Sequence, residues 1–136
     1  MPILEVLVGL PRSGKSTYAK QQLVCASPAV VVNPDSIRLA LHGQRFIAEA
    51  EDFVWAIAKT MVRSLFLAGH NRVLIDATNM TRARRSFWKS KSWQCLFVEF
   101  PTPVEVCMER AAGDPELQAV IQRMHKNYEP IGEDER

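Results

Sequence analysis

Residues 9–16 read Gly9-Leu10-Pro11-Arg12-Ser13-Gly14-Lys15-Ser16. This stretch matches the pattern G-x-x-x-x-G-K-[ST], in which glycines let consecutive main-chain N–H groups curl around phosphate oxygens. The apolar run of residues 3–8 precedes it and predicts a buried strand. A helix predicted over residues 15 to about 25 follows, and its N-terminus adds partial positive charge. Strand, loop and helix together favour a phosphate-binding site over a glycine-rich turn without a ligand.

Each residue type in the loop has a chemical reason to be there. Lys15 is placed to bridge the β- and γ-phosphates of a nucleoside triphosphate, and the Ser16 hydroxyl is placed to bind Mg²⁺. The remaining nucleotide contacts are expected from the rest of the loop and the first helical turn, namely Gly9, Pro11, Arg12, Ser13, Gly14 and Thr17.

Outward from this loop, the chain alternates between strand and helix patterns. Apolar runs predict further strands over residues 29–32, 72–76 and 96–100. Helices are predicted after a turn over residues 33–36, capped by Asp35 or Ser36, then over 48–68, from Thr81, over 104–112 and over 115–127. The residues expected to bury the long helix are Phe53, Ile57, Met61, Leu65 and Ala68. This order is typical of an α/β fold, a four-stranded parallel sheet with helices on both faces.

Length and composition set the class of protein. The chain has 136 residues, 47% of them hydrophobic and 24% charged, with a net charge of +2. These values predict one domain over residues 1–136, and the mild positive charge does not demand nucleic acid. Three scattered cysteines, two of them in apolar surroundings, favour a reducing compartment. No apolar run approaches a membrane span, and no signal-peptide pattern opens the chain, so a cytoplasmic location is expected. Oligomeric state is not predicted.

Ligands of parallel sheets collect at the carboxyl ends of the strands, so the residues that follow each predicted strand are candidates for chemistry. Asp35 can take a proton from an attacking hydroxyl, and Arg38 beside it can hold a phosphate on the acceptor. A helix cap with a surface ion pair explains the same two residues equally well. Asp76 can meet Mg²⁺ through water, or close an Asx turn. Arg110 suits a helical lid over the triphosphate, or a solvated helix.

A basic cluster lies late in the chain, and two readings of it stay open. It can steer an acidic polymer or form a solvated helix face, and the second reading is favoured. Aromatic side chains interleave with it at helical spacing, which indicates core positions rather than stacking platforms for bases. The basic residues are Arg82, Arg84, Arg85, Lys89 and Lys91, and the aromatic residues are Phe87, Trp88 and Trp93. Residues 130–136 are predicted to form an ordered turn followed by a charged tail.

Three motifs together resemble the kinase domain of phage-type polynucleotide kinases. They are the phosphate loop through Thr17, the segment Asn33-Pro34-Asp35-Ser36-Ile37-Arg38, and the segment Ile75-Asp76-Ala77-Thr78-Asn79. The resemblance covers roughly residues 3–130. It implies a P-loop kinase with strand order 2-3-1-4, a small helical lid near residues 110–123, and transfer of the γ-phosphate of ATP, with Mg²⁺, to a 5′-hydroxyl of a nucleic acid.

The resemblance also implies roles for single residues. Asp35 corresponds to the general base and Arg38 to the contact with the acceptor's 3′-phosphate. Asp76 and Thr78 match positions near the active site, Asp76 is expected to be catalytic, and Thr78 and Asn79 are expected to bind the substrate. Arg110 corresponds to the first lid arginine. The family usually carries a second lid arginine four residues later, where this chain has Asp114. Whether Arg123 replaces it is open.

Three functions remain from these observations. The first is a polynucleotide 5′-hydroxyl kinase, cytoplasmic, or in the host cytosol if phage-encoded. The second is a kinase for a nucleoside, nucleotide or other metabolite. The third is a nucleotide-binding regulatory module with little catalysis, supported by the missing second arginine. The choice between ATP and GTP, and between DNA and RNA, is open.

Overall fold

The centre of the protein is a four-stranded parallel sheet. We describe residues 1–43 and 46–136 of a computed structural model. The strands are β1 (Ile3–Val8), β2 (Val30–Val32), β3 (Arg72–Ile75) and β4 (Gln94–Glu99). Their order across the sheet is β2-β3-β1-β4, and every neighbouring pair is parallel. The predicted fold class and strand order are therefore confirmed, with strand ends shifted by one or two residues.

Alternation along the strands explains how helices cover both faces. In β1, Leu4 and Val6 pack into one core with α2 (Pro34–His42), α3 (Glu51–Leu67) and α4 (Arg82–Phe87). Leu7 points to the other face, where it packs with Ala19 of α1 (Lys15–Gln22). Glu5 also lies on that face, and it is buried because Arg72 and Tyr18 both donate hydrogen bonds to its carboxylate.

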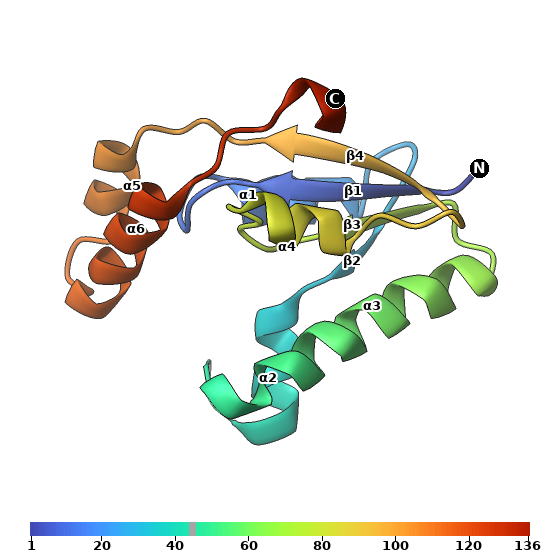
Figure 1. Ribbon diagram of the computed structural model, residues 1–136, viewed down its shortest axis with the longest axis horizontal. Helices are drawn as coiled ribbons and strands as arrows, with labels where there is room; N and C mark the ends of the chain where they lie inside the picture. Colours follow the sequence, from blue (N-terminus) through green and yellow to red (C-terminus); the bar gives the residue numbers. More distant parts are fainter. Residues whose placement is uncertain (44–45) are drawn as a thin grey trace.

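A pair of helices lies beyond the carboxyl ends of the strands (Figure 1). These are α5 (Val104–Arg110) and α6 (Pro115–Asn127), which form the predicted lid. Their shared core includes Cys107, Ala111 and Ile121, and it also takes in Leu10 from the phosphate loop. The loop and the lid are thus parts of one packed unit. Within the described residues, no helix has the length and apolar content needed to cross a bilayer.

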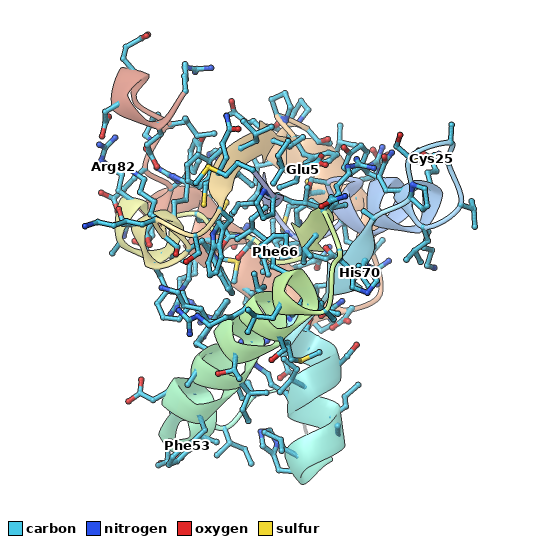
Figure 2. The ribbon with its side chains drawn as sticks, turned by 90° about the vertical axis from the view of Figure 1, so that its right-hand side faces the viewer. Glu5, Cys25, Phe53, Phe66, His70 and Arg82 are labelled. Atoms are coloured by element: carbon cyan, nitrogen blue, oxygen red, sulfur yellow. The ribbon has the colours of Figure 1, made fainter. Side chains whose placement is uncertain are left out.

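The predicted buried stripe of the long helix is wrong at three positions. A short 3₁₀ turn (Ala48–Ala50) precedes α3, whose buried residues are Val54, Ala58 and Val62. The expected residues Ile57 and Leu65 only flank this core, while Phe53, Met61 and Ala68 are exposed. Figure 2 shows Phe53 at the outer end of α3, pointing away from the sheet. The two stripes differ by one position on a helix that is apolar around much of its surface, and the smaller side chains let α3 approach the sheet.

The interpretation of the basic cluster as a solvated helix face holds for Lys89 and Lys91, which are exposed, but it is wrong for Arg85. Arg85 is fully buried, and its guanidinium donates to the carboxylate of Glu135 and to the carbonyls of Asn79 and Glu129. Arg82 pairs with Asp134 and Glu135. The last residues form a 3₁₀ turn (Glu133–Glu135), so the predicted ordered turn is confirmed, and the charged residues expected to follow it are part of the turn. Figure 2 shows Arg82 on the side of the molecule where this turn lies. The expected core positions of Trp88 and Trp93 are confirmed.

Candidate active site

The phosphate loop has a backbone that needs its glycines. Gly14 caps α1 with a φ of 107°, a left-handed conformation that side chains disfavour. Gly9 has no room for a side chain, because a Cβ there would lie 2.7 Å from Ser13 Oγ and 3.1 Å from the Phe100 carbonyl oxygen. Arg12 also has a positive φ, of 67°. The loop therefore keeps the curled path that directs main-chain N–H groups inward.

Lys15 is buried at the start of α1. Its ammonium donates to the carbonyl of Leu10 at 2.6 Å and to Ser13 Oγ at 3.3 Å. Burial lowers the pKa of Lys15 to about 8, against the opposing pull of the nearby charges on Asp76 and Asp35. An ammonium that is poorly compensated inside the loop is well suited to bind an added anion.

Hard oxygen ligands meet beside the loop. The Ser16 hydroxyl lies 3.2 Å from Asp76 Oδ2, and the Asn33 amide lies 3.5 Å from the same oxygen. Asp76 immediately follows β3, as predicted, and burial raises the pKa of its carboxyl. Hydroxyl and carboxylate oxygens are what Mg²⁺ prefers, together with phosphate oxygens and water. Ser16 and Asp76 therefore fit a magnesium ion that also touches a bound nucleotide.

Asp35 and Arg38 lie together on the first turns of α2. Arg38 donates to Asp35 Oδ1 at 2.6 Å, and its other donors bind both carboxylate oxygens of Glu51 at 2.7 and 2.9 Å. The Asp35 side chain is 65% exposed, whereas that of Arg38 is only 12% exposed. The cap of α2 is Asn33, whose side chain accepts from the Asp35 N–H, and not Asp35 or Ser36 as predicted. The Asp35 carboxylate thus stays exposed, held from one side by Arg38.

Asn79 does not occupy the substrate position expected for it. Its side chain is 1% exposed, because the amide donates to the Leu7 carbonyl at 2.7 Å and accepts from Trp88 Nε1 at 2.9 Å. These bonds hold the turn after β3 against the end of β1. Thr78 lies in the same turn, where its carbonyl accepts from the Gly9 N–H at 3.0 Å. Asn79 is therefore a structural residue, whereas Thr78 borders the phosphate loop.

A cavity of about 900 Å³ opens over the loop. Six of the predicted nucleotide contacts and Arg110 line it, while Gly9 and Pro11 do not. Tyr18, Gln21, Phe100 and Thr102 complete the wall and were not predicted, although Phe100 and Thr102 follow β4, where strand-end logic could have found them. The predicted residues in the wall are Arg12, Ser13, Gly14, Lys15, Ser16 and Thr17.

The lid is tied directly to the loop. Arg110 donates to the Arg12 carbonyl at 3.0 Å, and Thr102 Oγ1 donates to the Ser13 carbonyl at 2.8 Å. At the position of the missing arginine, Asp114 caps α6 by accepting from the Leu117 N–H. Arg123 is exposed on α6 and is not part of the cavity wall. Arg110 is therefore the cation of α5 and α6 that lines the cavity over the loop.

Glu51 is a site residue that no local sequence pattern indicates. It opens α3, thirteen residues after Arg38, and only the packing of α2 against α3 brings the two together. Contact with Arg38 lowers the pKa of Glu51, so it stays ionised as the partner of that guanidinium.

Comparison with known proteins agrees with this fold. A family model described as an AAA domain matches residues 4–131. A chain in a Pnkp1/Rnl/Hen1 complex is 31% identical over 83% of this protein, with a TM-score of 0.72. A chain of the Pnkp1/Rnl/Hen1 RNA repair complex is 26% identical over 94%, with a TM-score of 0.68. This protein spans only 40% and 46% of those two chains.

Smaller kinases share the fold along most of their length. A gluconokinase from Sinorhizobium meliloti 1021 is 19% identical, with a TM-score of 0.68, and the match covers 98% of this chain and 79% of the gluconokinase. The APS kinase CysC of Mycobacterium tuberculosis, solved with AMPPNP and APS, is 19% identical with a TM-score of 0.64. The match covers 90% of this chain and 75% of the APS kinase. A search of curated proteins found no match. The chain belongs to the AAA domain family and has the fold of a P-loop kinase, similar to chains of the Pnkp1/Rnl/Hen1 complexes.

Proposed function

We propose that the protein is an ATP-dependent kinase that transfers the γ-phosphate to a 5′-hydroxyl of a nucleic acid. The observation that carries this proposal is the exposed Asp35 carboxylate, held by Arg38 in the same charge cluster as Lys15 and Asp76. A carboxylate in that position is suited to accept the proton of an attacking hydroxyl. The identity to chains of the Pnkp1/Rnl/Hen1 complexes supports a nucleic acid as the acceptor.

Each side chain then has a task in the transfer. The loop N–H groups and the Lys15 ammonium bind the phosphates, Asp35 receives the hydroxyl proton, and Arg110 stabilises the charge of the transferred group. Ser16, with Asp76 beside it, would hold Mg²⁺, which neutralises charge on the phosphates when bound. Tyr18 and Phe100, whose rings meet edge to face at 5.4 Å, supply an apolar part of the cavity wall.

A small-molecule acceptor is the second candidate, because a gluconokinase and an APS kinase share the fold. The protein spans 79% of the gluconokinase chain but 40% of the chain from the Pnkp1/Rnl/Hen1 complex.

Transfer from γ-labelled ATP, with Mg²⁺, decides between these functions. The acceptors are a 5′-hydroxyl oligoribonucleotide, its DNA equivalent, a nucleoside and a set of sugars. We expect label on the oligonucleotide ends, and an acceptor KM that rises steeply between 50 and 200 mM salt because phosphate contacts release counterions. Label on small acceptors alone, with little effect of salt, would favour the second candidate. Slow hydrolysis without any labelled acceptor would favour a regulatory module.

A further inference from the structure

The outer face of α3 carries a row of side chains at the spacing of a coiled coil. Phe53, Ile57, Thr60, Ser64 and Leu67 follow one another at intervals of four, three, four and three residues. This spacing is typical of a helix face that packs against another helix. Phe53 is 68% exposed and Leu67 is 82% exposed, so both ends of the row point to solvent. Figure 1 shows α3 at the outside of the molecule.

The middle of this row is hollowed. A cavity of about 370 Å³ lies there, because the central side chains of Ala56, Thr60 and Ser64 are small. Ile57, Met61 and Leu65 supply its apolar walls. Small residues let the axis of a second helix come close, and bulky apolar residues at the ends of the row would cover that helix. An exposed apolar face of this kind indicates a protein–protein contact.

The order of large and small side chains fits a second copy of α3 that runs in the opposite direction. A two-fold axis near residues 58 and 59 gives three layers, each of which occurs twice. Across the two copies, these layers pair Ile57 with Thr60, Phe53 with Ser64, and Leu67 with Ala50. Each layer combines a larger with a smaller side chain, which fills the contact without voids or overlap. A parallel pair would instead place Phe53 on Phe53 and Ser64 on Ser64.

The charges along α3 are complementary to the same arrangement. Glu49 and Asp52 lie at its start, Arg63 lies towards its end, His70 follows the end, and all four are exposed. Figure 2 shows Phe53 and His70 near opposite ends of the helix. Antiparallel association places the acidic end of one copy beside the basic end of the other, and it also opposes the two helix dipoles. A parallel pair would bring like charges together.

We propose that the protein forms a two-fold dimer through the outer face of α3, with the helices of the two copies antiparallel. The partner is a second copy of this chain, because both the side-chain sizes and the charges of the face are complementary to the face itself. None of the five residues of the row lines the cavity over the phosphate loop, so the contact leaves that cavity open.

Sedimentation velocity of the wild-type chain, from about 1 to about 200 µM, measures the self-association. We expect a dimer whose population rises with concentration, and a monomer at every concentration would overturn the proposal. Phe53→Ser should raise the dimer Kd at least about a hundredfold, because each dimer loses two buried phenyl rings. The control Val24→Ser alters an apolar residue that is 84% exposed between α1 and β2, and should leave the Kd unchanged. Dimers of Phe53→Ser as tight as those of the wild type would also overturn the proposal.

The exchange variant Phe53→Ser/Ser64→Phe tests the direction of the helices. In an antiparallel pair both changes fall in the same layer, so the Kd should return to within about tenfold of the wild-type value. In a parallel pair they fall in different layers, and the dimer stays weak. Failure of the exchange to strengthen the dimer of Phe53→Ser would therefore refute the antiparallel contact.

Charge reversal gives a second test that leaves the apolar row intact. Glu49→Lys should raise the dimer Kd roughly two- to thirtyfold, because two exposed charge pairs are lost in each dimer. Glu49→Lys/His70→Glu should recover the wild-type Kd, because the charges are exchanged between the two ends. If the second substitution does not reverse the effect of the first, the antiparallel contact is wrong. Circular dichroism of every variant should match that of the wild type, since the substituted residues are exposed.

Discussion

At the scale of single residues, the ionisation of Lys15 makes the affinity for ATP depend on pH. Its pKa is about 8 in the free protein because it is buried. Bound phosphates favour the charged ammonium, so binding raises this pKa. The wild-type protein therefore takes up a proton on binding above about pH 8, and its affinity for ATP should fall with pH there, by up to about tenfold per pH unit.

Calorimetry in buffers of different ionisation enthalpy measures that proton uptake directly. Lys15→Met is the control, since it binds ATP more weakly but loses the pH dependence above pH 8. If the affinity of the wild-type protein for ATP stays constant between pH 7 and 9.5, the lowered pKa given above for Lys15 is contradicted.

The second prediction at this scale concerns the removal of the Arg110 side chain. It is exposed and lines the cavity, so its removal should spare the fold and reduce kcat by roughly ten- to a thousandfold through the loss of charge stabilisation. Arg123→Ala, on the outer part of α6, should change kcat little. Equal effects of the two substitutions on kcat would show that Arg110 has no special role.

At the scale of elements, the C-terminal turn holds α4 in place. Glu135 is the buried partner of Arg85, and the contact lowers its pKa. Glu135→Ala leaves Arg85 buried without its counter-ion and should lower the free energy of unfolding by about 3–5 kcal/mol. Asp134→Ala removes an exposed partner of Arg82 instead, and should leave the urea midpoint unchanged. Similar midpoints for the two variants would contradict this account.

The same ion pair predicts how acid changes the stability of the folded protein. The pKa of Glu135 in the folded protein lies below the ordinary glutamate value of 4.5. The ion pair therefore makes its full contribution to the free energy of unfolding above pH 4.5. The contribution is lost as the pH falls through the lower, folded pKa. The difference in unfolding free energy between wild type and Glu135→Ala should therefore shrink progressively below pH 4.5, which urea unfolding across that range measures.

Some structural elements can be predicted from sequence patterns alone, and others cannot. The phosphate loop is a local motif, so its flanking strand and helix can be predicted from the loop and the apolar run before it, and other apolar runs predict the other strands. The buried stripe of α3 does not follow, because Val54 and Phe53 start equivalent apolar rows and only the sheet selects between them. Glu51 beside Arg38 and Glu135 beside Arg85 depend on packing between segments far apart in the chain. Those partners lie outside what local patterns can predict.

At the scale of the whole molecule, the phosphate loop follows β1 and the helix that carries Asp35 follows β2, so both begin at the carboxyl ends of the strands. The helices α5 and α6 lie beyond the same edge of the sheet (Figure 1). Leu10 in the lid core, with the contacts of Arg110 and Thr102 to the loop, couples lid position to loop conformation. Nucleotide binding should therefore act on loop and lid together.

The most direct test of the central claim is Asp35→Asn. The amide keeps the size of the side chain but cannot accept the hydroxyl proton as a carboxylate does. We expect phosphate transfer to a 5′-hydroxyl oligonucleotide to fall by roughly 10²- to 10⁴-fold, while the Kd for ATP changes less than about twofold. Transfer at the wild-type rate by Asp35→Asn would contradict the account.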